Sequence, residues 1–351
     1  MHSIVVIRRF PEASDRKTGL GVYADKIEKI ITDRGCELNT VHMSVSKRNG
    51  FLMAIVNGMI RPFFAIANLN DKNKIYHAAD ELCSMMFPFI SGKKVMTVHH
   101  VLRKDDNSTF LYSKLWRFVT KVGLKRADKI IAASPQTKEE MMREFGIKEE
   151  KIIVAMSHLG EQYKTITPDS EREKLIGCMG EFIPRKNTDS AIRTFRKLLD
   201  MPGMSEFKMK ICGKGRGYGD MVQMTKDLGI DDKVIFTRDL SEDDIVRFYN
   251  SLSLFSNPSR HEGLGLPTLE AQLCSSPVVY FKDANIPEEV IRAAVPSSDE
   301  DDYVNNMYRL LTDEEFRAKT IKEGREYAER FGKDFPDKLM KVYDEVSEYR
   351  A

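Results

Sequence analysis

The sequence is poor in cysteine and lacks a long apolar segment. Its five cysteines, among 351 residues, are widely spaced and form no CxxC pair. We therefore expect reduced thiols in a cytoplasmic protein, and neither disulfides nor a zinc site. No uncharged apolar run approaches the roughly 18 residues that a membrane-spanning helix needs. The short apolar stretch at residues 3–7 is ended by Arg8 and Arg9, which is not the pattern of a secretory signal.

Charge is unevenly distributed, although the formal net charge is only +2. Residues 1–160 contain 26 Lys and Arg against 17 Asp and Glu, whereas the remainder contains 29 against 36. A basic half joined to an acidic half indicates different partners for each half, or chance, because net charge governs association and not fold.

Short apolar runs separated by helical patterns recur along the chain. They occupy residues 4–7, 75–77, 95–98, 129–133, 152–155, 175–179, 207–211, 234–236, 252–255 and 278–281. Apolar runs without alternation are typical of parallel strands that are covered on both faces. The expected fold class is α/β, with two doubly wound, Rossmann-like domains facing a central cleft at the carboxyl ends of their strands.

The domain boundaries follow from composition. Residues 160–174 are polar and aperiodic, and we interpret them as a linker between a domain at 1–163 and a domain at 164–332. Residues 333–351 are expected to form an amphipathic helix with Pro336 in its first turn. Its apolar face comprises Leu339, Val342, Tyr343 and Val346.

The stretch SRHEGLGLPTLEAQLCSSP, residues 259–277, follows one of the expected strands. Pro267 suits the first turn of a helix, and the amides before it would then form an anion site at the helix N-terminus. Those amides belong to Gly263, Leu264, Gly265 and Leu266. Glu270, about one turn into the helix, suits a ribose diol. Glu262 suits sugar hydroxyls or positive charge at a reacting carbon.

Two acids beside an anion site require cations nearby. Arg185 and Lys186 supply them, because they end the stretch that follows the strand at residues 175–179. A cationic pair is what a leaving diphosphate needs.

These motifs resemble those of a known family. HEGLGLPTLEA resembles the E-x7-E signature of the retaining family 4 glycosyltransferases (glycosyl transferases group 1), which have the GT-B fold. Further motifs are similar in order and spacing. GLGVY (19–23) looks like the glycine loop after the first strand, and TVHHV (97–101), RADKIIAAS (126–134), GEFIPRKN (180–187) and ICGKG (211–215) also match. The resemblance covers essentially the whole chain.

The resemblance implies a hexosyltransferase that works without metal or cofactor and retains anomeric configuration. The donor would be a GDP- or UDP-linked sugar, with mannose or glucose favoured. The acceptor would be a hydroxyl of a glycan, a polysaccharide or a lipid-linked molecule, and no nucleic acid is implied. The domain at 1–163 would hold the acceptor and the domain at 164–332 the nucleotide sugar, with the last helix returning to the first domain.

The family's roles transfer to matching positions of this chain. Glu270 would bind the ribose and Glu262 the donor sugar, Lys186 and Arg185 would stabilise the departing phosphate, and His99 would lie beside the transferred sugar. The remaining implied donor contacts are Gly19, Gly21, Gly213, Gly263, Leu264, Gly265 and Leu266. For His99, a core histidine satisfied by backbone is the alternative.

Two positions depart from the family pattern. Glu181 stands where many relatives have arginine, and Arg238 where relatives have glycine beside the nucleobase. Glu181 keeps open a non-catalytic nucleotide-sugar-binding subunit. A nucleotide-dependent oxidoreductase is a further alternative, although the glycines of ICGKGRGYGD are misplaced for a GxGxxG fingerprint.

Residues 47–69 combine basic residues with a broken apolar run. A buried helix pair is the favoured interpretation. The alternative is an interfacial segment that contacts anionic lipid peripherally, on the inner face of the membrane.

Overall fold

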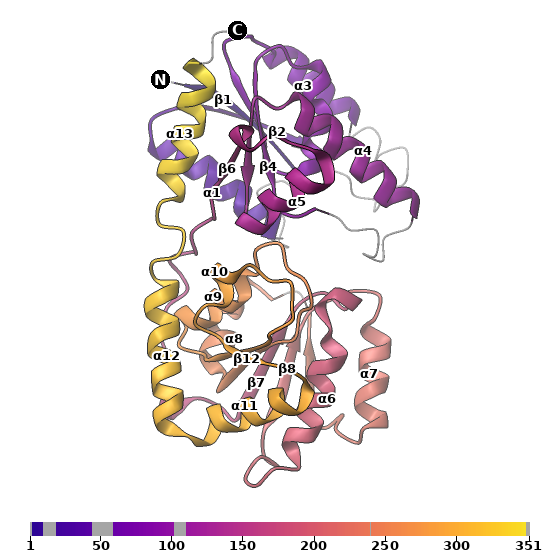
Figure 1. The fold of residues 1–351 in the computed structure, drawn as a ribbon, viewed down its shortest axis with the longest axis vertical. Helices are drawn as coiled ribbons and strands as arrows, with labels where there is room; N and C mark the ends of the chain where they lie inside the picture. The colour runs from indigo at the N-terminus through magenta and orange to yellow at the C-terminus, as the bar shows by residue number, and fades with distance from the viewer. Residues whose placement is uncertain (1, 10–18, 44–58, 102–109, 239, 349–351) are drawn as a thin grey trace. The chain divides into compact units, whose positions relative to one another are not determined.

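The computed structural model describes residues 2–9, 19–43, 59–101, 110–238 and 240–348. The chain folds into two compact units (Figure 1). Unit 1 comprises residues 1–158 and 332–351, and unit 2 comprises residues 159–331.

Unit 1 contains a six-stranded parallel sheet in the order β2-β1-β3-β4-β5-β6. Its strands are β1 (Ser3–Arg9), β2 (Glu37–Met43), β3 (Ile75–Ala78), β4 (Lys93–Val98), β5 (Lys129–Ala132) and β6 (Ile152–Val154). β2 was not expected from the sequence, because this edge strand has only two buried residues, Val41 and Met43, and carries polar residues between apolar ones.

Helices cover both faces of this sheet. They are α1 (Gly19–Asp33), α3 (Arg61–Leu69), η3 (Glu81–Phe89), α4 (Phe110–Arg126), α5 (Pro135–Phe145), η4 (Glu149–Lys151) and α13 (Phe335–Glu348). On one face, α1 and α13 share an apolar cluster with the strands. On the other, α3, η3 and α4 share a second cluster. The expected apolar face of the last helix is the one that α13 buries.

The motif GLGVY, residues 19–23, is helical. It forms the first turns of α1, so the expectation of a glycine loop there is wrong for these residues. Gly21 and Tyr23 are buried on the inner side of the helix.

Unit 2 contains a second six-stranded parallel sheet, in the order β12-β11-β10-β7-β8-β9. Its strands are β7 (Leu175–Met179), β8 (Lys208–Cys212), β9 (Val234–Thr237), β10 (Leu254–Asn257), β11 (Val278–Phe281) and β12 (Val295–Ser297). β10 lies two residues beyond the expected run at 252–255. The short edge strand β12 was not expected.

The helices of unit 2 also form two layers. They are η5 (Asp169–Glu171), η6 (Pro184–Lys186), α6 (Thr188–Leu199), α7 (Tyr218–Asp227), α8 (Glu242–Ser251), α9 (Leu266–Leu273), α10 (Glu288–Ile291), α11 (Glu300–Thr312) and α12 (Glu314–Ala328). Residues of α6 and α11 lie in one apolar cluster, and residues of α8 and α9 lie in another. β7, β10 and β11 are therefore buried on both faces, as their runs of apolar residues predict. The edge strands β9 and β12 each have only one buried residue.

Part of the apolar stretch at 47–69 forms α3, while residues 47–58 lie outside the described residues. α3 buries only Pro62 and Ile66. Phe63 and Phe64 are exposed, so the described part does not form the buried helix pair that was favoured.

Candidate functional site

In unit 2, the segments that follow β7 and β10 bring the predicted acid and cations together. Lys186 Nζ lies 2.5 Å from Glu262 Oε1, and Arg185 Nη1 lies 3.4 Å from Glu262 Oε2. Glu262 is 6% exposed. Burial by itself raises the pKa of this carboxyl. The charge and hydrogen bond of Lys186, with help from Ser259 and Arg185, outweigh burial and hold the pKa of Glu262 below its ordinary value.

Backbone hydrogen bonds hold this arrangement in place. The amide of Arg260 donates to the carbonyl of Arg185 at 2.8 Å, which ties the β10 loop to η6. The amide of Glu262 donates to Asn285 O at 3.1 Å. Asn187, in the left-handed region at φ 51°, donates from Nδ2 to Pro258 O at 3.0 Å. Asparagine is among the few residues that adopt this conformation readily.

The glycine loop leads directly into α9. Gly265 precedes the helix with φ 81°, a left-handed conformation that favours glycine. Pro267 occupies the first turn, where its missing N–H costs nothing. The helix therefore starts beside Glu262, and its N-terminal partial positive charge lies at this loop.

Glu270 lies in the middle of α9 and is half-buried. Tyr249 Oη donates a hydrogen bond to Glu270 Oε2 at 3.0 Å. The ring of Tyr163 packs edge-on against that of Tyr249, with the ring centres 6.1 Å apart, and burial, helped by the charge of Glu270, raises the pKa of Tyr163. Sequence analysis did not identify either tyrosine, because neither belongs to a motif and both are distant from Glu270 along the chain.

Gly213 has a packing role. A Cβ at this position would lie 1.9 Å from the carbonyl oxygen of Gly180, so only glycine allows the segments after β7 and β8 to approach. The two segments are joined by hydrogen bonds from Gly180 N to Cys212 O and from Phe182 N to Lys214 O.

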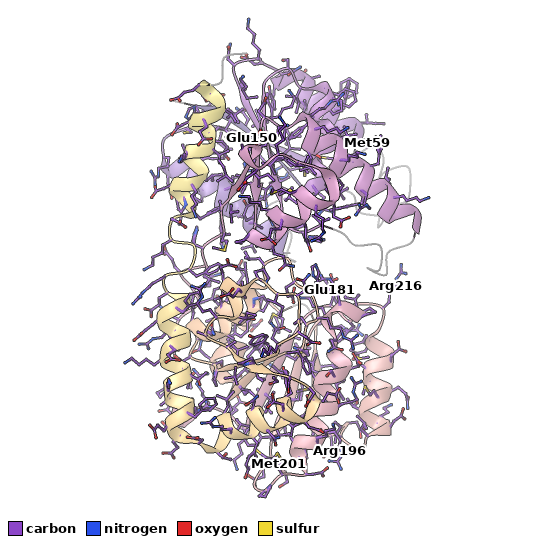
Figure 2. All side chains as sticks on the ribbon, in the orientation of Figure 1. Met59, Glu150, Glu181, Arg196, Met201 and Arg216 are labelled. Carbon is purple, nitrogen blue, oxygen red and sulfur yellow. The ribbon has the colours of Figure 1, made fainter. Side chains whose placement is uncertain are left out.

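The two residues that depart from the family pattern are both exposed. Glu181 directly follows Gly180 (Figure 2). The Arg238 guanidinium lies 3.6 Å from the ring centre of Tyr218, at the end of β9.

In unit 1, His99 follows β4 and is half-buried. Its Nε2 lies 2.9 Å from Ala79 O, so Nε2 carries the proton and Nδ1 is the basic nitrogen of the neutral ring. The ring of Tyr23 meets it edge-on at 4.5 Å. This hydrogen bond to a backbone carbonyl is what we expected if His99 were a core histidine satisfied by backbone. It uses Nε2 and not Nδ1.

Glu81 supports the histidine loop and was missed by sequence analysis. The buried Glu81 Oε1 accepts from His99 N at 2.6 Å and from His100 N at 3.2 Å. An acid in the first turn after β3 was the only local signal, and it is a common feature of helix starts.

Gly21 is held by a buried arginine of β1. Arg8 Nη2 donates to Gly21 O at 3.3 Å, and Arg8 forms ion pairs with Asp25 at 2.6 Å and Glu28 at 2.7 Å. A Cβ on Gly19 would meet nothing within 4 Å.

The described part of the chain contains neither a metal-binding cluster nor a membrane-spanning helix. No cluster of three or more His, Cys, Asp and Glu side chains that could hold a metal ion occurs there. None of its helices has the length and apolar character to cross a membrane.

Family models match both units. The model described as glycosyl transferases group 1 matches residues 160–327, and that described as glycosyltransferase family 4 matches residues 44–155.

Curated relatives are similar over part of their length. The chain is 26% identical over 185 residues to a D-inositol 3-phosphate glycosyltransferase of Corynebacterium jeikeium, covering 50% of this chain and 44% of that one. It is 24% identical over 209 residues to the O-antigen chain mannosyltransferase RfbU of Salmonella typhimurium, covering 56% and 58%. The chain thus spans about half the length of the curated relatives it matches.

Solved structures match the fold of the whole chain. A sucrose-phosphate synthase from Thermosynechococcus elongatus is similar with a TM-score of 0.81, at 15% identity and 99% coverage of both chains. Anabaena HepE in complex with UDP-glucose has a TM-score of 0.74 at 15% identity, covering 98% of this chain and 100% of that one. With a glycosyltransferase model matched in each unit and the fold shared from end to end, the protein belongs to the family 4, group 1 glycosyltransferases of GT-B fold.

Proposed function

We propose that the protein transfers a hexose from a nucleoside diphosphate sugar to an acceptor hydroxyl, with retention of anomeric configuration and without a metal or cofactor. Mannose is favoured because one curated relative is named as a mannosyltransferase. Glucose is favoured because one of the similar structures, HepE, was solved in complex with UDP-glucose. A glycan or lipid-linked acceptor is favoured by the relative that is named as an O-antigen chain mannosyltransferase.

The observation that carries this proposal is the ion-paired Glu262 of unit 2. Its carboxylate is buried and is held charged by Lys186 and Arg185. A donor diphosphate is a stronger partner for these cations than a single carboxylate, because it carries more charge and more acceptor oxygens. Donor binding would therefore draw Lys186 and Arg185 to the phosphates and leave Glu262 for the hydroxyls of the sugar.

The same residues supply the chemistry of bond cleavage. Negative charge develops on the phosphate oxygen as the glycosidic bond breaks, and fixed cations stabilise it without a metal. The α9 N-terminus, with the amides of Gly263 to Leu266, adds partial positive charge at the donor. Glu270 would accept from the ribose diol, His99 would lie beside the transferred sugar, and Gly19 and Gly21 of α1 would contact the donor.

Nucleotide-sugar binding and turnover test the proposal together. We expect at least one hexose linked to UDP or GDP to raise the melting temperature, since ligand at a hundred times its Kd stabilises by roughly 2.7 kcal/mol. The Glu270→Gln variant should lose most of this shift. Binding without any hydrolysis or transfer would favour the non-catalytic subunit, and a shift with nicotinamide cofactors alone would favour the oxidoreductase.

We also infer that unit 1 binds peripherally to an anionic membrane surface. α3 and α4 pack against η3 on one side of the sheet (Figure 1), and neither helix contains an acidic residue. The exposed large apolar side chains on and beside these helices are Met59, Ile60, Phe63, Phe64, Phe89, Leu115 and Phe118. Met59 is labelled in Figure 2.

Basic side chains accompany this apolar surface, which favours anionic lipid as its partner. Lys114, Lys121 and Lys125 are exposed at helical spacing around Phe118 on α4. Aromatic side chains with flanking lysines are typical of interfacial binding. The phosphate headgroups of a membrane would also bring the enzyme to a lipid-linked acceptor.

Liposome co-sedimentation tests the membrane contact. The chain should bind anionic vesicles at low salt, and a Phe64→Ser, Phe118→Ser double variant should bind much less. An Ile235→Ser variant, altered at an exposed apolar side chain of unit 2, is the matched control. Equal binding to neutral vesicles, or no binding at all, would contradict the inference.

A further inference from the structure

The carboxylate of Glu270 is held by Tyr249, which packs against a second tyrosine, Tyr163, and no motif identifies either residue. Tyr249 is fully buried, and its hydroxyl donates to Glu270 Oε2 at 3.0 Å. Burial, followed by the charge of Glu270, raises the pKa of both Tyr163 and Tyr249 well above the ordinary value. Both hydroxyls therefore remain protonated at neutral pH, and that of Tyr249 donates to the carboxylate.

Tyr163 belongs to the connecting segment, residues 160–174, at which the chain enters unit 2. Its ring meets that of Tyr249 edge-on at 6.1 Å and packs on the apolar cluster beneath α8 and α9. This polar segment was interpreted as a linker, yet one of its side chains packs on the tyrosine that binds the candidate ribose-binding acid.

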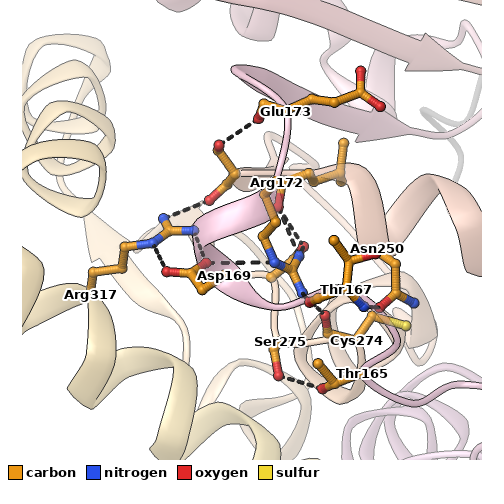
Figure 3. A network of polar contacts seen from close by, with 12 residues as sticks. Thr165, Thr167, Asp169, Arg172, Glu173, Asn250, Cys274, Ser275 and Arg317 are labelled. Carbon is orange, nitrogen blue, oxygen red and sulfur yellow. Dashed lines mark hydrogen bonds and ion pairs between the residues drawn. The ribbon is translucent and has the colours of Figure 1, made fainter.

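The rest of the connecting segment is fixed to the ends of α8 and α9 (Figure 3). Asn250, in the last turn of α8, accepts from Ile166 N at 2.7 Å and donates to Lys164 O at 3.0 Å. Thr165 Oγ1 lies 2.5 Å from Ser275 Oγ, just beyond α9.

Arg172 clamps the two helix ends to the same segment. Its guanidinium donates to Leu252 O at 2.8 Å, beyond α8, and to Cys274 O at 2.5 Å, beyond α9 (Figure 3). Asp169, three residues earlier, forms an ion pair with Arg317 of α12 at 2.5 Å. The connecting segment is therefore fixed by hydrogen bonds to the ends of α8 and α9, the helices that carry Tyr249 and Glu270.

We propose that Tyr163 and Tyr249 are positioning residues for Glu270, so that ribose recognition depends on the connecting segment between the units. The inference rests on the proposed function, in which Glu270 binds the ribose. A carboxylate has about four lone-pair sites. The Tyr249 hydroxyl occupies one of them and fixes the carboxylate plane, while the ring of Tyr163 holds Tyr249 in place, which leaves sites for the paired hydroxyls of a diol.

Tyr163 also makes the connecting segment responsive to the donor. A diol bound to Glu270 stabilises the carboxylate orientation that Tyr163 supports, and by linkage it stabilises the placement of Tyr163. The segment that joins the units is thus more firmly held when the ribose site is occupied.

Calorimetric titration with paired nucleotides tests the inference. The ligands are the nucleoside diphosphate, UDP or GDP, that binds the wild-type chain more tightly, and its 2′,3′-dideoxy analogue. Tyr249→Phe removes only the hydroxyl that donates to Glu270, and Tyr163→Leu removes the ring that packs edge-on against Tyr249. Each variant should bind the nucleoside diphosphate about 5- to 10-fold more weakly, the effect of one lost or misplaced hydrogen bond, and should bind the dideoxy analogue as the wild type does.

Tyr308→Phe is the matched control, because Tyr308 lies half-buried on α11 in the other apolar cluster of unit 2. It should leave the affinity for both ligands unchanged. Equal weakening for both nucleotides in the Tyr163 and Tyr249 variants would indicate a merely structural role and overturn the inference, as would wild-type affinity for the diphosphate.

The wild-type titration separates failure of this inference from failure of the proposed function. A wild-type chain that binds both nucleotides equally does not recognise the diol, which would refute the ribose role of Glu270 and the inference with it. A wild-type chain that prefers the diol, with tyrosine variants that keep the full preference, would refute only the positioning role.

Discussion

The two acids of this site are oriented by neighbouring side chains before a ligand binds. Glu262 is ion-paired with Lys186 and Arg185, and Glu270 accepts a hydrogen bond from Tyr249. Each acid thus has a fixed orientation and a partner that stabilises its charge. Preorganised groups of this kind lose little entropy when a ligand arrives.

His77 is the buried titratable residue whose effect on stability is clearest. Its ring bonds to Tyr343 Oη at 2.6 Å and Thr97 Oγ1 at 2.8 Å, and burial, with a smaller effect of His99, lowers the pKa of His77 to about 3. The unfolded chain, with an ordinary pKa near 6.5, takes up a proton at a higher pH than the folded one. The stability that His77 confers is therefore complete above about pH 6.5 and declines as the pH falls toward 3.

We predict that this residue alone makes unit 1 less stable by up to about 1.4 kcal/mol for each pH unit below 6. Urea unfolding at pH 7, 6 and 5 would measure it. The His77→Gln variant, which cannot titrate, should show a shallower loss between pH 6 and 5. An identical slope in the two proteins would contradict the assignment.

At the scale of elements, α9 depends on the backbone conformation of one glycine. Gly265 has φ 81°, and a Cβ there would meet Glu262 and Val290 at ordinary contact distances. The cost of a side chain would thus come from the left-handed backbone and not from a clash.

We predict that Gly265→Ala destabilises unit 2 by about 1–2 kcal/mol, and that Gly265→Asn costs less because asparagine tolerates this conformation. Gly219→Ala is the control, since Gly219 lies inside α7 with open space around its Cα. That change should stabilise by up to about 1 kcal/mol. Denaturant midpoints measure all three, and equal effects of Ala at both positions would be inconsistent with the argument.

Local sequence patterns predicted several of these elements and missed others. Runs such as 175–179 and 278–281 predicted buried parallel strands, because a strand covered on both faces needs apolar residues throughout. The proline-started helix that carries Glu270 was equally local. β2 was missed because an edge strand can be polar, and GLGVY was taken for a loop although it is helical. Tyr163 and Glu81 act through contacts between distant segments, for which the sequence has no local signal.

At the scale of the whole molecule, the chain contains two parallel α/β units whose surfaces differ in charge. The basic first half includes the apolar and lysine-rich surface of α3 and α4, and the acidic second half includes the paired acid and cations. This division supports different partners for the two units, an acceptor near anionic lipid for unit 1 and the donor for unit 2.

The proposed function requires that Lys186 of unit 2 stabilises the leaving phosphate of a nucleotide sugar and that the anomeric configuration is retained. The most direct measurement is time-resolved proton NMR of the released or transferred hexose, before mutarotation, for wild type, Lys186→Ala and the control Lys208→Ala. Lys208 is exposed and begins β8, at the amino end of the strand, whereas Lys186 lies beyond the carboxyl end of β7.

We expect a product with the anomeric configuration of the donor from the wild-type and Lys208→Ala proteins. The rate should be lower by at least about 100-fold for Lys186→Ala, because one lost contact to the leaving group costs on the order of 3 kcal/mol. An inverted product, or near-normal turnover by Lys186→Ala, would refute the proposed chemistry.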